Sequence, residues 1–344
     1  MLRHFIELDD FSKDELLHML DLIRFLKEAD RKGVTPRLLR GMTLGMLFES
    51  ASLRTRVSFE TAMMELGGHA IYLKPGEIHL GVRESIYDTI QVLSRMCDGI
   101  MARTHLLETM HEIVDSASVP VINGMTTYSH PTQGLCDFFT MTEHLPKGKT
   151  LEEMKVAFVS DASHVGCICT SLREILPIFG SHLVVAAPEP FQVEPQEVAK
   201  TKAACQATGA TFEMTDDPIE AVQGADFIVT DVWWYEGYDD QKEARLKIFM
   251  PKYQINRNLL DHAPAHCMVL HCMPANRDYE ITSEVMDSPS SVIFEEAENR
   301  FHTQKALLLW FLYPNRPNPS PALQQYYEGA TEAYLQEHIP PIKA

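Results

Sequence analysis

Two arginines and two hydroxyl side chains fall within five residues, Ser52-Leu-Arg-Thr-Arg56, between a predicted strand and a predicted helix. The first-turn N–H groups of a helix have no partners within the helix and lie at the positive end of its dipole. An anion is therefore stabilised there, and arginine and hydroxyl donors add hydrogen bonds suited to phosphate oxygens. The stretch predicts a phosphate site; a capped helix with two surface arginines is the alternative.

Further polar side chains follow other predicted strands. Arg103 ends one strand, and His130-Pro-Thr-Gln133 stands between a strand and a helix. His271-Cys-Met-Pro274 holds the corresponding position in the second half of the chain. Open α/β sheets bind ligands in the crevice at the C-terminal ends of their strands. We therefore expect these donors to meet at one site.

The elements that must carry these residues alternate between strand and helix. Apolar runs predict strands over residues 44–48, 71–73, 99–103, 119–122, 156–159, 183–186, 227–229 and 268–271. Helices are expected between them, beginning with one capped by Ser12 and Glu15 and including a long apolar one over residues 294–312. The pattern predicts an α/β chain of two doubly wound parallel-sheet domains of similar size, linked by helices.

The domain boundary is expected near Pro146. Residues 1–147 would form a first domain, joined by C-terminal helices over residues 300–344, and residues 148–299 a second. A length of 344 residues fits two domains of about 150 residues each.

Composition excludes several classes of function. Thirty lysines and arginines against 48 aspartates and glutamates leave a net charge of −18, which disfavours nucleic acid and anionic membranes as partners. There is no G-x-G-x-x-G or P-loop motif, so no nucleotide cofactor is expected. Cys167-x-Cys169 is interpreted as helix packing, and Glu295, Glu296 and Glu298 as a solvated charge run. No metal is predicted.

A cytoplasmic location is expected. The seven cysteines show no paired metal spacing, which fits a reducing compartment. The N-terminus lacks the basic start and apolar centre of a signal peptide, and no apolar stretch reaches the length of a transmembrane helix.

The combination of motifs resembles the aspartate/ornithine carbamoyltransferase superfamily, over about residues 40 to 310. The matching stretches occur in the family's order: Ser52-Leu-Arg-Thr-Arg56, Arg103, His130-Pro-Thr-Gln133, Asp231-Val-Trp, His271-Cys-Met-Pro274 and Ala297-Glu-Asn-Arg300. Within the superfamily the chain is most similar to the putrescine carbamoyltransferases, in phrases such as Val57-Ser-Phe-Glu-Thr-Ala-Met63 and in its helical C-terminal extension.

The resemblance implies a role for each matched residue. The phosphate of carbamoyl phosphate would be bound by Ser52, Leu53, Arg54, Thr55 and Arg103. The carbamoyl group would be oriented by His130, Gln133 and Arg300. The residues expected to take part in catalysis are Arg103, His130, Cys272 and Arg300. The acceptor amine would lie against His164, Asp231, Cys272 and Met273. The resemblance implies a homotrimer with no cofactor and no metal.

Departures from the family pattern concern the acceptor. Ornithine enzymes carry Ser-Met-Gly after Asp-Val-Trp, whereas this chain reads Trp233-Trp-Tyr-Glu-Gly-Tyr-Asp-Asp240. Its aromatics and carboxylates could hold the distal ammonium of a diamine; an acidic surface loop is the alternative. His79 stands where the family has a glutamine that reaches the neighbouring subunit's site. Ser160-Asp-Ala-Ser-His164 replaces a glycine-led stretch.

Putrescine is therefore the first expectation for the acceptor, giving N-carbamoylputrescine and phosphate. The reaction could also run in reverse in agmatine catabolism. Ornithine or another diamine or amino acid remains open as the acceptor, because the imidazole of His164 could meet a carboxylate. The substitutions at 79, 160 and 164 also leave open a catalytically silent paralogue that binds carbamoyl phosphate.

Overall fold

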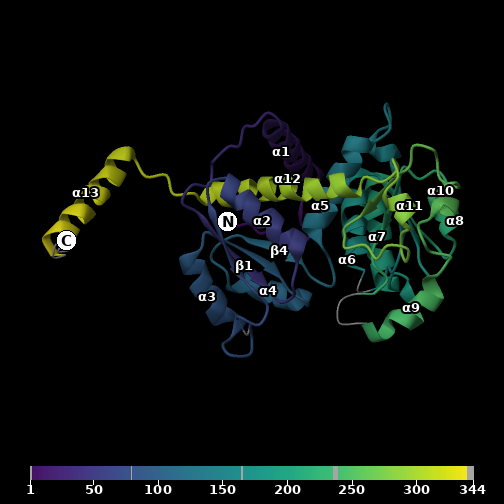
Figure 1. The fold of residues 1–344 in the computed structure, drawn as a ribbon, viewed down its shortest axis with the longest axis horizontal. Helices are drawn as coiled ribbons and strands as arrows, with labels where there is room; N and C mark the ends of the chain where they lie inside the picture. The colour runs from purple at the N-terminus through teal and green to yellow at the C-terminus, as the bar shows by residue number, and fades with distance from the viewer. Residues whose placement is uncertain (1, 79, 164–165, 235–238, 339–344) are drawn as a thin grey trace.

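Two parallel sheets form the framework of the computed structural model, which describes residues 2–78, 80–163, 166–234 and 239–338 (Figure 1). The first sheet has the order β2-β1-β3-β4, with strands Thr43–Phe48 (β1), His69–Leu73 (β2), Gly99–Arg103 (β3) and Val121–Met125 (β4). The second has the order β7-β6-β5-β8-β9, with strands Lys155–Val159 (β5), His182–Ala186 (β6), Phe212–Thr215 (β7), Phe227–Thr230 (β8) and Met268–His271 (β9). All pairings within these sheets are parallel, which confirms the predicted α/β class.

Helices connect the strands and cover the sheets. In the first half they are Lys13–Arg31 (α1), Leu53–Glu65 (α2), Ile86–Met96 (α3), Leu107–Ser116 (α4) and Pro131–His144 (α5). In the second half they are Cys167–Phe179 (α6), Pro195–Thr208 (α7), Pro218–Val222 (α8), Lys242–Phe249 (α9), Arg257–Leu260 (α10) and Ser283–Met286 (α11). Two helices end the chain, Ile293–Leu312 (α12) and Pro321–His338 (α13). The capping box predicted for α1 is present, because Ser12 Oγ accepts from the Glu15 N–H at 3.3 Å.

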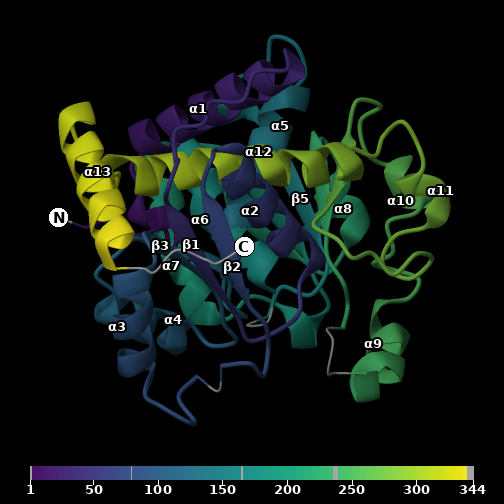
Figure 2. The same cartoon turned by 60° about the vertical axis from the view of Figure 1, so that its left-hand side comes forward.

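Packed helices join the two sheets into one body. The long helix α12 packs against α1, α2 and α5, and α5 packs against α6 (Figure 2). Phe138 of α5 stacks on Phe179 of α6, with ring centroids 4.4 Å apart. Both belong to one hydrophobic cluster that also holds Phe48 of β1 and Phe158 of β5. A shared core of this kind fixes the crevice between the two sets of strand ends.

The C-terminal helix α13 stands apart from this body (Figure 1). None of its residues is buried. Tyr326 and Tyr327 are each more than 60% exposed. Over the stretch of chain that can be described, no helix combines the length and the apolar character needed to cross a bilayer.

Two strands depart from the sequence prediction. The edge strand β7 was not predicted, because its four residues hold only two apolar ones, Phe212 and Met214, and a single repeat is too short to mark a period. The prediction of a strand over residues 119–122 was wrong at its start, since β4 begins at Val121. Pro120 directly before it has no N–H to donate to a sheet.

Candidate active site

A cavity of about 380 Å³ opens where the C-terminal ends of strands from both sheets meet. Residues after β1, β3 and β4 line one side, and residues after β8 and β9 line the other. The walls include the predicted site residues Ser52, Leu53, Arg54, Thr55, Arg103, His130, Gln133, Asp231, Cys272, Met273 and Arg300. The fold therefore gathers into one cavity residues that are far apart in the chain.

The first turn of α2 forms the most cationic wall. The helix begins at Leu53, so its unpaired N–H groups lie at the cavity. Ser52 Oγ does not cap the helix but accepts from Arg103 Nη1 at 3.5 Å, while Arg103 Nε donates to Ser50 Oγ at 3.2 Å. Burial lowers the pKa of Arg103 to about 10, so its guanidinium stays charged at pH 7. Poorly hydrated cations beside open N–H groups strongly favour an anion.

Arg300 connects three parts of the cavity wall. Its Nη2 donates to Thr55 Oγ1 of α2 at 3.2 Å, and its Nη1 donates to Gln133 Oε1 of α5 and lies 3.4 Å from His130 Nε2. Only 3% of the residue is exposed. Fixed donors of this kind, kept from water, suit a carbonyl oxygen that gains negative charge during a reaction.

His130 is neutral at pH 7. Burial, followed by the charges of Arg300, Arg103 and Arg54, lowers the pKa of the imidazole well below 6.5. Its backbone N–H donates to Ser171 Oγ at 2.9 Å, and Nδ1 lies 3.3 Å from Thr132 Oγ1. The backbone of His130 is therefore held by α6, and its imidazole brings no positive charge of its own to the site.

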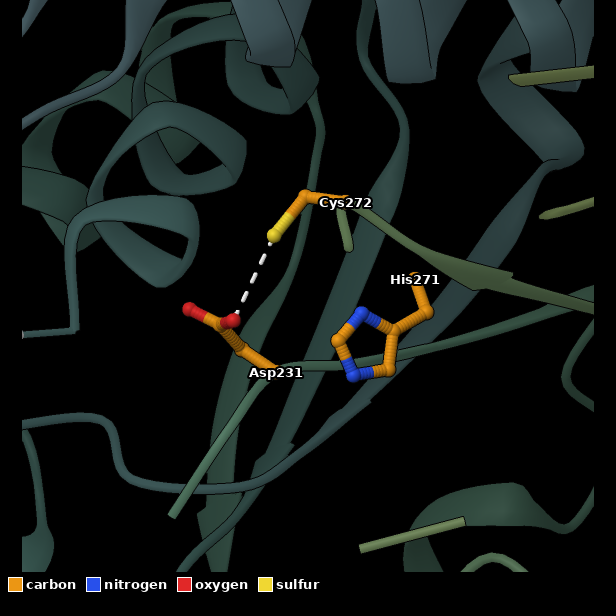
Figure 3. Close-up of side chains that lie close together, drawn as sticks. All are labelled: Asp231, His271 and Cys272. Carbon is orange, nitrogen blue, oxygen red and sulfur yellow. Dashed lines mark hydrogen bonds between the residues drawn. The ribbon is translucent and has the colours of Figure 1, made fainter. Parts of the chain in front are cut away.

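The opposite wall is built on the ends of β8 and β9. Cys272 Sγ donates to Asp231 Oδ1 at 3.3 Å, as Figure 3 shows, and the Val232 N–H donates to the same oxygen at 2.8 Å. Ser160 Oγ donates to the Asp231 carbonyl at 2.8 Å. Burial, with Asp231 next in effect, raises the pKa of the Cys272 thiol well above 9.0. Cys272 is thus a protonated hydrogen-bond donor at neutral pH, not an ionised nucleophile.

The separations between possible ligand atoms would allow a metal ion to be bound by Asp231, His271 and Cys272. One possible ligand atom from each lies within 4.8 Å of the others (Figure 3). Each ring nitrogen of His271 has a neighbour, since Nδ1 accepts from the Met273 N–H at 2.9 Å and Nε2 lies 3.3 Å from Glu280 Oε1. A metal would have to displace these contacts and the thiol hydrogen, so the trio is organised here as a hydrogen-bonded wall.

The aromatic run after Asp231 splits between core and cavity. Trp233 is fully buried and stacks on Phe249 with ring centroids 5.1 Å apart, whereas Trp234 lines the cavity. The ammonium of Lys242 lies 4.7 Å from the centre of the Trp234 ring, a contact that shows this face accepting a cation. Asp240 is exposed.

Two interpretations from the sequence need correction. Glu296 was placed in a solvated charge run, but it is 1% exposed, while Glu295 and Glu298 are exposed. The helical spacing of Glu296 to Arg300, four residues on, was the signal that could have placed it on the inner face of α12. Cys167 is buried as predicted, yet it also lines the cavity. The residues His79, His164 and Glu236 lie outside the described part of the chain.

Comparison with known proteins gives one consistent answer. The family model for the aspartate/ornithine carbamoyltransferase carbamoyl-P binding domain matches residues 3–143, and that for the Asp/Orn binding domain matches residues 152–311. A putrescine carbamoyltransferase of Mycoplasma mycoides is 46% identical, covering 97% of this chain and 93% of that protein. An ornithine carbamoyltransferase of Pyrococcus horikoshii is 42% identical over 90% of this chain and 96% of its own length.

Solved structures agree with the sequence comparison. The ornithine carbamoyltransferase from Pyrococcus furiosus superposes with a TM-score of 0.85 at 40% identity, covering 90% of this chain and 97% of that one. Both sheets, the site residues between them and the two family models thus point the same way, and the chain belongs to the aspartate/ornithine carbamoyltransferase family of enzymes.

Proposed function

We propose that the enzyme transfers the carbamoyl group of carbamoyl phosphate to putrescine. The observation that carries the proposal is that Arg54, Arg103 and Arg300 line one cavity at the start of α2. The choice of putrescine is supported by the 46% identity to a putrescine carbamoyltransferase, against 42% for an ornithine carbamoyltransferase over a smaller share of the chain. Trp234 at the cavity wall supports a cationic tail on the acceptor.

In the proposed mechanism, the phosphate lies against Ser52, Leu53, Arg54, Thr55 and Arg103. The carbamoyl group lies against His130, Gln133 and Arg300. The neutral amine nitrogen attacks the carbonyl carbon, and Thr55, Arg103 and His130 stabilise the resulting oxyanion. The bond from that carbon to the phosphate oxygen then breaks, and the departing phosphate accepts the proton of the amine. Since both substrates are held in line, proximity supplies much of the rate.

Asp231, Cys272 and Met273 form the proposed amine side. Free amines of this kind have a pKa of about 10.4, so deprotonation at pH 7 costs about 4–5 kcal/mol. A poorly hydrated site lowers that cost, because burial disfavours the ammonium form. No dedicated enzymatic base is then required.

The rate should follow the amine's protonation. Below the amine's pKa, the neutral fraction rises about tenfold per pH unit, so kcat/KM for putrescine should rise by about that factor between pH 8 and 9, above the pKa of about 7 of Asp137. His130 adds no titration in that window, because its pKa lies well below 6.5. Initial rates at subsaturating putrescine measure the profile. A flat profile would contradict attack by the neutral amine.

A panel of acceptors tests the substrate. With carbamoyl phosphate saturating, putrescine, a longer and a shorter diamine, ornithine and lysine are compared by ureido-product formation. We expect kcat/KM for putrescine to exceed that for ornithine by at least about tenfold. Equal or better rates with ornithine would remove putrescine as the substrate. Carbamoyl phosphate binding without product from any amine would indicate a silent paralogue.

We also propose the domain and assembly pattern implied by the family. Residues 1–147 with the C-terminal helices would form the carbamoyl phosphate domain, and residues 148–299 the amine domain. A homotrimer is supported by an apolar groove beside the cavity, on α2 and α12, where Leu53 is 70% and Val57 50% exposed. A cytoplasmic location is supported by seven cysteines that are all free thiols.

A further inference from the structure

Two buried carboxyl groups lie behind the cavity, outside the residues that the mechanism uses. Asp137 of α5 is fully buried, and Glu296 of α12 is 1% exposed. Gln133 Nε2 donates to both, at 2.6 Å to Asp137 Oδ1 and 2.9 Å to Glu296 Oε1. One amide nitrogen thus joins the two carboxyl groups, which we call the acid pair. It can do so because the side-chain amide of glutamine carries two N–H donors.

Burial favours the protonated form of both acids. Burial raises the pKa of Asp137 to about 7 and that of Glu296 well above 4.5, and the proximity of the two acids raises the latter further. The charged groups that influence the pair are Arg300 on α12, Asp231 at the end of β8 and Arg54 on α2.

Glu296 contacts both halves of the site. Its Oε1 accepts from Gln133 Nε2, and Gln133 Oε1 in turn accepts from Arg300 Nη1. Glu296 is thereby linked to the donors at the carbamoyl end of the cavity. Its other oxygen, Oε2, accepts from the His271 N–H at 2.8 Å, directly before Cys272. The backbone carbonyl of Glu296 additionally accepts from Cys136 Sγ at 3.2 Å. One carboxyl group thus bonds to the first turn of α5 and to the end of β9.

We propose that Glu296 is a positioning residue for carbamoyl transfer. It holds Gln133 and Arg300 at the carbamoyl end of the cavity, and the Cys272 segment at the amine end, in fixed positions relative to each other. A near-attack geometry depends on the relative placement of the two substrates, and a shift of about 1 Å there costs about 10² in rate. The inference rests on carbamoyl transfer as the reaction, whichever amine is the acceptor.

Glu296→Gln tests this role, because it keeps the size of the side chain but removes one of its acceptor oxygens. We expect about a tenfold loss in kcat/KM for carbamoyl phosphate and a rise in KM for the amine. In a Gln133→Ala background, the same change should lower kcat/KM for carbamoyl phosphate by less than about threefold, because Glu296 acts there through Gln133. The effect on the KM of the amine should persist, because it passes through His271.

Glu143→Gln is the matched control. Glu143 joins the same two helices, since it accepts from Asn299 Nδ2 of α12 at 2.8 Å, but it does not line the cavity. We expect Glu143→Gln to keep the wild-type kcat and KM values, even if its thermal unfolding midpoint changes. Equal kinetic losses in Glu296→Gln and Glu143→Gln would overturn the proposal. It would also be overturned if kcat/KM for carbamoyl phosphate in the double variant Glu296→Gln/Gln133→Ala fell by the product of the two single losses. Wild-type enzyme without product from any amine would instead refute carbamoyl transfer itself.

Discussion

Replacing Arg54 with alanine is expected to lower kcat/KM for carbamoyl phosphate by at least about 10². Arg54 is the second residue of α2 and lines the cavity beside the open N–H groups of that helix. Burial lowers the pKa of its guanidinium, which marks a cation that has lost part of its water and gains more from an anion. Steady-state rates with varied carbamoyl phosphate measure the loss.

Arg56→Ala is the control for this prediction. Arg56 lies on the same turn, but its Nε donates to Glu60 Oε2 at 3.0 Å and its guanidinium stacks 3.9 Å above the centre of the Tyr72 ring. A simple loss of positive charge would affect both variants. We expect Arg56→Ala to stay within about threefold of the wild type, and a similar loss in both would refute a specific phosphate contact by Arg54.

Arg300→Met should have the largest effect, with losses in both activity and stability. Turnover should fall by about 10³, because three contacts at the carbamoyl end disappear together, to Thr55, Gln133 and His130. The free energy of unfolding should also fall, because Thr55 Oγ1 and Gln133 Oε1 lose a buried donor. Leaving a buried polar group unsatisfied typically costs about 1–3 kcal/mol. Single-turnover rates and urea unfolding measure the two losses.

An exposed arginine provides the comparison. Arg277 pairs with Asp287 through two hydrogen bonds of 2.7 Å, with both side chains largely in water. Exposed pairs contribute little because water screens them. Arg277→Met should therefore leave both urea midpoint and turnover near the wild type. Wild-type stability in Arg300→Met would show that the buried hydrogen bonds of Arg300 do not stabilise the fold.

The sequence was sufficient to predict the main strands and the meeting of their ends. Continuous apolar runs such as Val156-Ala-Phe-Val159 mark strands buried on both faces, and parallel strands present their C-terminal ends at one edge. Arg103 and His130, which lie at or after the ends of neighbouring strands, could therefore be placed near each other from the sequence. The short edge strand β7 could not, since its four residues hold only one repeat of the apolar alternation.

The burial of the acid pair could not be predicted from local sequence patterns. Glu296 lies between the exposed residues Glu295 and Glu298, and a carboxylate in such a run is usually solvated. Its burial depends on Gln133 and on the His271 N–H, which belong to other elements of the chain. A charged group becomes tolerable in a core only when such partners converge, so its location is decided by tertiary structure.

The central claim is that three guanidinium groups and the start of α2 form one carbamoyl phosphate site. A crystal structure with a phosphonate bisubstrate analogue tests it most directly. We predict the phosphonate on the Ser52–Thr55 turn with Arg54 and Arg103, and the analogue's carbonyl oxygen within hydrogen-bond distance of Arg300 or His130. A phosphonate bound away from the α2 turn, or a carbonyl oxygen turned away from both Arg300 and His130, would contradict the account.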